Sequence, residues 1–204
     1  MNIQKTLLIL GLSSTLLIAA QPNQQKQHNM QLKKVIQTGK QTTKLLLHTL
    51  GSQMKKKMKA GGPMEALDFC SQEAFTLTDS VNKKLDKGVS VKRVSLKYRS
   101  AANAPTADET QMLQTLEQLN KQHVVAPNFF VQQVQPNVYK FYKPLVIKKK
   151  VCLKCHGDIA NEKLKDAIAQ RYPQDKALHY KMGDLRGAVV VTITTDNNTT
   201  KKAK

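Results

Sequence analysis

Apolar residues recur every three or four positions over two stretches in the first half of the chain, and this spacing predicts two helices. The first runs from about Met30 to Lys59, and its apolar positions lie among lysines and glutamines. These positions are Leu32, Val35, Ile36, Leu46, Leu47 and Leu50. Gly61-Gly62-Pro63 ends this helix and begins the second, because proline is well tolerated in the first turn of a helix.

The second predicted helix extends to Gly88 and carries a cysteine on its apolar face. Residues that step by three and four along a helix share one face. Here they are Leu67, Cys70, Ala74, Leu77 and Val81. Cys70 is therefore expected to point toward the core.

Later in the chain, alternating or β-branched apolar runs predict four strands. They cover residues 89–98, 129–134, 138–147 and 189–193, with turns at 103–105, 136–137 and 183–187. Further helices are expected at 108–122 and 161–171. This order predicts an α+β fold, in which a PAS-like antiparallel sheet is flanked by helices on one side.

The beginning of the chain has the pattern of a secretory signal peptide. Lys5 supplies the positive charge, residues 7–18 form a short apolar stretch, and Ala19-Ala20 ends it with small residues. Leu17 and Ile18 stand where a cleavage site favours small residues, so an uncleaved anchor is the alternative. We expect a signal peptide at 1–20, a polar leader at 21–29, one domain at 30–195 and a basic tail at 196–204, in a periplasmic protein.

Basic residues far outnumber acidic ones. The chain of 204 residues has 33 Lys plus Arg against 14 Asp plus Glu, a formal charge of +19. This balance favours anionic partners, either an acidic protein or the anionic surface of a membrane. Nucleic acid is excluded as a partner because export separates the two and the sequence has no nucleic-acid-binding motif. Simple solubility is the ordinary explanation for scattered lysines.

The stretch Cys152-Leu153-Lys154-Cys155-His156 has the attachment pattern of a c-type haem. Each thiol adds to one vinyl group at a haem edge, one helical turn places both sulfurs along that edge, and the adjacent imidazole ligates the iron. A thioredoxin-type redox pair would need a βαβ unit around it, which the sequence does not predict. A zinc site would need further ligands. A disulfide between Cys152 and Cys155 is the third alternative.

Cys70 is the third and last cysteine of the chain. A buried lone cysteine is most often a small apolar residue. In a haem protein it is also a candidate for the second axial position on iron, since thiolate ligation is an established mode. The rival axial ligands are Met64, Met182, His48, His123 and His179.

Several blocks of the sequence, together with the haem motif, resemble a known family. They are Glu65-Ala66 through Cys70, Ser95-Leu96-Lys97 with Arg99, Asn103-Ala104-Pro105, Tyr142-Lys143-Pro144-Leu145, Tyr172-Pro173 with Asp175, Tyr180, Gly183-Asp184 and Arg186-Gly187-Ala188. The chain resembles exported haem c domains with a PAS-like fold, a family of unknown function with a cyanobacterial structural prototype. Two departures are the lack of an aromatic residue in Thr106–Thr110 and the presence of His179 before Tyr180.

The resemblance implies one covalent haem c held by Cys152 and Cys155, with His156 and Cys70 as axial ligands. It also implies a redox or small-ligand sensor without catalysis of its own, whose output passes to a separate partner protein. The alternative is a monohaem cytochrome that only transfers electrons.

Overall fold

The computed structural model describes residues 21–195. The expected signal peptide at 1–20 and the basic tail at 196–204 lie outside these residues. The chain divides into two compact units, residues 1–34 and 35–204. In the first unit residues 21–34 are helical, whereas the sheet, the helices that cover it and the site belong to the second. Within the described part of the chain, no helix combines the length and apolar character needed to cross a membrane.

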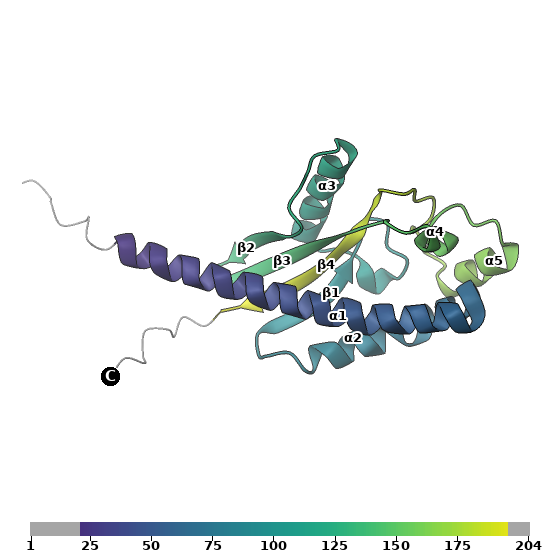
Figure 1. The fold of residues 1–204 in the computed structure, drawn as a ribbon, viewed down its shortest axis with the longest axis horizontal. Helices are drawn as coiled ribbons and strands as arrows, with labels where there is room; N and C mark the ends of the chain where they lie inside the picture. Colours follow the sequence, from purple (N-terminus) through teal and green to yellow (C-terminus); the bar gives the residue numbers. More distant parts are fainter. Residues whose placement is uncertain (1–20, 196–204) are drawn as a thin grey trace, which may run out of the picture. The chain divides into compact units, whose positions relative to one another are not determined.

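Five α-helices and four strands make up the described part of the chain (Figure 1). The helices are α1 (Gln21–Gln72), α2 (Ala74–Asn82), α3 (Ala107–Lys121), α4 (Lys150–His156) and α5 (Glu162–Arg171). The strands are β1 (Val89–Val94), β2 (Phe130–Gln135), β3 (Val138–Val146) and β4 (Leu185–Thr194). A short 3-10 turn, η1 (Ala101–Asn103), follows β1.

The strands form one sheet in the order β1-β4-β3-β2, and each neighbouring pair is antiparallel. A two-residue turn, Pro136-Asn137, joins β2 to β3, and Asn137 adopts a φ of 62°. Asparagine tolerates this left-handed conformation better than most residues, which suits a tight hairpin. The predicted α+β fold with an antiparallel sheet is confirmed.

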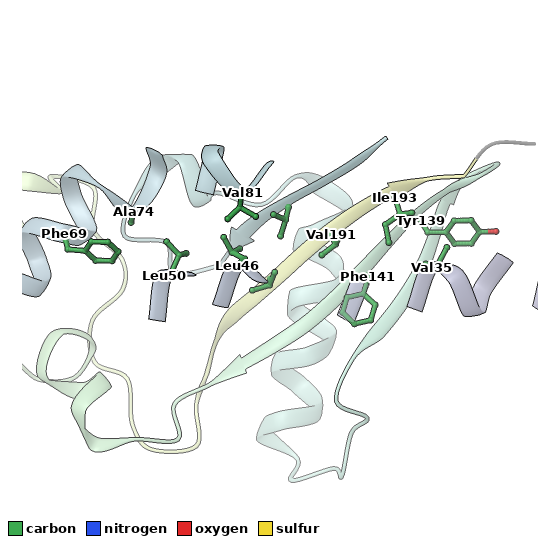
Figure 2. Close-up of a cluster of buried hydrophobic side chains, with 12 residues drawn as sticks. Val35, Leu46, Leu50, Phe69, Ala74, Val81, Tyr139, Phe141, Val191 and Ile193 are labelled. Carbon is green, nitrogen blue, oxygen red and sulfur yellow. The ribbon is translucent and has the colours of Figure 1, made fainter. Parts of the chain in front are cut away.

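One face of the sheet packs against α1 and α2 (Figure 2). The helices contribute Val35, Leu46, Leu50, Phe69, Ala74 and Val81. The sheet contributes Val91, Tyr139, Phe141, Val189, Val191 and Ile193. Since burial of apolar surface is the main driving force for folding, this cluster is the principal core of the domain.

The other face of the sheet is covered by α3, so the expectation that helices lie on one side only was wrong. Leu113 of α3 is fully buried against Val94, Tyr142, Ala188 and Val190. Successive residues of a strand point to opposite faces, so the continuous apolar run of β4 contacts helices on both faces.

Gly61 and Gly62 have non-helical backbone angles, so α1 consists of two helical parts that meet at the predicted break. The second part ends at Gln72, and α2 follows at Ala74, where a single uninterrupted helix was predicted. Helix α1 also begins earlier than expected, at Gln21, within the predicted polar leader. Lysine and glutamine favour helix intrinsically, although they give no apolar periodicity that would reveal it.

Strand β4 begins at Leu185, inside the predicted turn at 183–187. Gly187, which suggested a turn, lies within the strand with a φ of 151°. A Cβ atom at this position would lie 2.2 Å from the Val94 carbonyl oxygen. Glycine is thus required by the close approach of β1 to β4, which a sequence pattern alone does not reveal.

A buried carboxylate joins α3 to the sheet. Glu109 has a relative exposure of 1%, and its carboxylate accepts hydrogen bonds from the Thr106 backbone N–H at 2.9 Å and from Lys140 Nζ at 3.0 Å. Lys92 of β1 lies 2.9 Å from the same carboxylate. Burial alone would raise the pKa of Glu109, but these three donors together hold it below its usual value.

Replacing Glu109 with alanine is expected to lower the free energy of unfolding by about 2 kcal/mol, because Lys92 loses its carboxylate partner and Lys140 keeps only the more exposed Asp108. Since the folded-state pKa is lowered, the contribution of Glu109 is present above the ordinary carboxyl range and is lost as pH falls through the folded pKa. Urea unfolding at several pH values checks both points. The matched control is Glu117→Ala, which removes an exposed pair with Lys121 and is expected to cost at most about 0.5 kcal/mol. Equal losses in the two variants would contradict the prediction.

Candidate functional site

Helix α4 carries the Cys-x-x-Cys-His motif. Residues three apart share one face of a helix, so Cys152 and Cys155 lie one turn apart on the same face. Cys155 packs against an apolar cluster shared by α1 and α5, and Cys152 against another that includes Ile147 and Tyr180. All three cysteines of the chain are free thiols.

His156 is the last residue of α4, and its ring is fixed from two directions. Nδ1 lies 3.0 Å from the carbonyl oxygen of Ala177, so it is the nitrogen that donates a hydrogen bond. The ring also makes an edge-on contact with Tyr180, with ring centroids 6.2 Å apart and an interplanar angle of 86°. With Nδ1–H engaged, Nε2 carries the free lone pair, which is the usual arrangement of a metal-binding histidine.

The charge state of His156 also suits a metal ligand. Burial, followed by the positive charges of Arg186 and Arg99, holds the pKa of His156 well below its usual range. The imidazole is therefore neutral at neutral pH, and no proton has to leave before Nε2 can bind a metal.

Arg99 connects α4 to residues 175–177, which include the Ala177 carbonyl that orients His156. Its guanidinium donates to the carbonyl oxygens of Cys155 at 2.7 Å and Ala177 at 3.2 Å, and it forms an ion pair with Asp175 at 3.0 Å. The other carboxylate oxygen of Asp175 accepts a hydrogen bond from the Ala177 backbone N–H at 2.7 Å. Arg99 and Asp175 therefore fix the position of the carbonyl that orients His156.

The chain just beyond residues 175–177 is held by Tyr180. Its backbone N–H donates to the His156 carbonyl oxygen at 2.9 Å. Two cations lie over its ring, with Lys97 Nζ 4.4 Å and the Arg186 guanidinium 5.3 Å from the ring centroid. Such cation–π contacts favour one ring position, which in turn restricts the ring of His156.

Cys70 lies in the second part of α1 and packs against the principal core, together with Leu77, as its helical face predicted. Burial raises the pKa of the Cys70 thiol to about 11, opposed mainly by the positive charge of Arg93 and increased by the neighbouring Cys155. The structure thus brings Cys70 into electrostatic range of the motif, although 82 residues separate it from Cys152 (152 − 70 = 82). Without a metal, Cys70 is a protonated thiol at neutral pH.

The rival axial ligands lie at the surface. His48, His123 and His179 are exposed, and the exposed fractions of Met64 and Met182 are 38% and 46%. His179 Nδ1 is 2.5 Å from the Asp158 carboxylate, so its ring is already engaged. None of the five has the half-buried position of Cys70.

Comparison with known proteins gives one family. The model of the Tll0287-like family matches residues 18–194. The chain belongs to the Tll0287-like family. No curated protein matches it. The crystal structure of the cyanobacterial heme-protein Tll0287 is 24% identical, and the match covers 81% of this chain and 95% of that chain with a TM-score of 0.55. At this identity the likeness shows the fold alone.

The Tll0287-like membership confirms the predicted resemblance, while the alternatives for the motif find little support in the fold. Helix α4 follows a strand of an antiparallel sheet, whereas a thioredoxin-type pair requires a βαβ unit. Among residues 21–195, no group of three or more His, Cys, Asp or Glu side chains is placed to hold a metal ion by itself. Zinc therefore has no ligand set in the described part of the chain.

Sequence reasoning named four candidate haem-binding residues but missed the contacts that orient His156. Arg99, Asp175, Tyr180 and Arg186 entered only as matches to Tll0287-like sequences, without a role. Ala177 was missed because a backbone carbonyl has no side-chain signal. Arg93 was also missed, since an arginine in a predicted strand is usually expected to face the solvent.

Proposed function

We propose that this protein carries one haem c, bound through thioethers of Cys152 and Cys155, with His156 as proximal ligand and Cys70 as distal ligand. The residues fit the group. Two free thiols lie on one face of α4, and the adjacent imidazole is neutral with its Nε2 lone pair free. The observation that carries the proposal is the hydrogen bond from His156 Nδ1 to Ala177, because it selects the tautomer that binds a metal.

When bound, the haem supplies an iron that can accept or release one electron. Cys70 gives this change a structural consequence. Its thiol is protonated at neutral pH in the absence of a metal, so it binds as a thiolate only where the metal displaces the proton. A thiolate favours the ferric state, and it is the donor more readily lost on reduction or when a small ligand competes.

His156 is held in place by several contacts. Arg99, Asp175 and Tyr180 fix its ring and backbone, whereas no hydrogen bond to Cys70 Sγ occurs among the described residues. One firmly held and one weakly held ligand suit a redox or small-ligand sensor, and we therefore propose that role. We further propose that the protein is periplasmic, has no catalysis of its own and passes its signal to a partner protein or at an anionic membrane surface.

Electron transfer is the alternative role, and one observation favours it. Lys148, Lys149 and Lys150 are all exposed immediately before the motif. A cationic strip beside a haem attracts acidic redox partners, chiefly at low ionic strength. Loss of the Cys70 ligand on reduction, or on addition of carbon monoxide, would support the sensor, and a six-coordinate iron in both oxidation states would support the carrier.

Expression with a c-type maturation system is expected to yield a protein whose haem peroxidase stain migrates with the polypeptide in a denaturing gel. Cys152→Ala combined with Cys155→Ala should abolish the stain, because both thioethers are lost. Cys70→Ala is the matched control, since it removes the third thiol and should leave the stain intact. A colourless parent protein would refute the proposed function.

A further inference from the structure

A cavity apart from the cysteine motif, here named the α3 cavity, lies between α3 and one end of the sheet. Its volume is about 200 Å³, and its walls come from α3, from the loop that joins α3 to β2 (Figure 1), and from residues at one end of β2, β3 and β4. No cysteine or histidine of the described chain lines it. The large apolar residues of its wall are Leu116, Leu119, Val124, Phe130, Val146 and Leu185.

Hydrogen bonds hold the walls of the α3 cavity in place. The Asn120 side chain donates to the Gly183 carbonyl oxygen at 2.9 Å, which ties the end of α3 to the turn before β4. Lys143 Nζ donates to the Asn128 carbonyl oxygen at 2.8 Å, which ties the loop after α3 to β3. The cavity is therefore formed before any ligand enters, as is usual for small-molecule sites.

Lys143 and Lys148 give the α3 cavity a positive charge. Both line it, whereas none of the described residues around it is Asp or Glu. Neither lysine forms an ion pair with a carboxylate in the part of the chain that the structure describes. Burial, followed by the positive charge of Lys148, lowers the pKa of Lys143. An anion between the two lysines relieves this repulsion, so the cavity favours a negatively charged ligand.

We propose that the α3 cavity binds a small carboxylate with an apolar body, such as a short-chain fatty acid. The carboxylate accepts charge-assisted hydrogen bonds from Lys143 and Lys148, and the apolar body packs against Leu119 and Phe130. The cavity is smaller than the ~300–1,000 Å³ of drug-sized sites, which limits the ligand to a small molecule. This site does not depend on the proposed haem function, because none of the proposed haem-binding residues lines it.

The test is a titration of the full-length chain with hexanoate, followed by saturation-transfer NMR of the ligand. Saturable binding is expected. Hexanamide keeps the shape of hexanoate but not its charge, and it should bind about tenfold more weakly because it cannot pair with two ammonium groups. Inorganic phosphate carries charge without an apolar body and should not displace hexanoate at equal concentration.

Variants of adjacent lysines locate the binding site. Lys143→Met should weaken hexanoate binding about tenfold, and Lys148→Met, which removes a more exposed charge, about fivefold. Lys149→Met is the matched control, since it removes the same charge from the next residue, which does not line the α3 cavity, and should leave the affinity within about twofold of the parent.

Absence of hexanoate binding, or equal affinity for hexanamide, would overturn the proposal. Equal losses in Lys148→Met and Lys149→Met would also overturn it, because they would show a general attraction of anions to the basic surface. A chain that binds hexanoate as expected but carries no covalent haem would refute the proposed function and leave this site standing.

Discussion

Replacing Cys70 with alanine is expected to change the ferric haem from a thiolate-ligated low-spin form to a high-spin or histidine-like form, with the covalent attachment intact. The reduction potential should rise, because the ferric state loses its anionic ligand. We expect the reduction equilibrium to change at least tenfold, which corresponds to ~59 mV for one electron. Absorption spectroscopy, electron paramagnetic resonance and potentiometric titration measure the three effects.

The control for this variant must separate ligand loss from loosening of the core, because Cys70 packs against the same cluster as its neighbours. Leu77→Ala is suitable, since Leu77 contacts that cluster from α2 and has no donor atom. It should lower the free energy of unfolding by about 2–3 kcal/mol and leave the ferric spectrum unchanged. If Cys70→Ala also left the spectrum unchanged, Cys70 would be a small core residue, and the distal ligand would lie elsewhere.

The parts of the fold that were predictable from sequence are those with local causes. Gly61-Gly62-Pro63 broke the first helix where expected, because these residues alter backbone preferences wherever they occur. Pro136-Asn137 made the predicted hairpin for the same reason. The start of β4 was not predictable, since Gly187 serves a contact with Val94, which is 93 residues earlier (187 − 94 = 93).

The candidate site also has some features with local causes and others that depend on long-range contacts. The spacing of Cys152, Cys155 and His156 is a local feature of the sequence, and it indicated a haem-attachment motif directly. The expectation that Cys70 is an iron ligand came from the resemblance, because periodicity indicated only that its side chain faces the core. The contacts of Arg99 join residues 56 to 78 positions apart, and long-range pairs of this kind leave no periodic pattern in one sequence.

Replacing Asp175 with alanine is expected to loosen the position of His156 without altering any of the proposed iron ligands. Arg99 would lose its ion-pair partner, and the Ala177 backbone N–H would lose its acceptor. Breaking a buried ion pair of this kind costs about 3–5 kcal/mol, which chemical denaturation measures. Loss of an outer partner typically weakens metal ligation about 10–100-fold, so a larger fraction of the ferrous haem should lose its histidine ligand. The iron–histidine stretching band in resonance Raman spectra of the ferrous protein reports that fraction.

A purely structural role for Asp175 would lower stability but leave the histidine–iron bond as it is, and the spectra would then match the parent at temperatures well below unfolding. Asp158→Ala is the matched control. Asp158 contacts His179 just after the motif, but its carboxylate is 83% exposed and no contact links it to the Ala177 carbonyl that orients His156. This variant should change the free energy of unfolding by no more than about 0.5 kcal/mol and leave the iron–histidine band as in the parent. Similar changes in both variants would show that the hold on His156 does not depend on the Arg99–Asp175 pair.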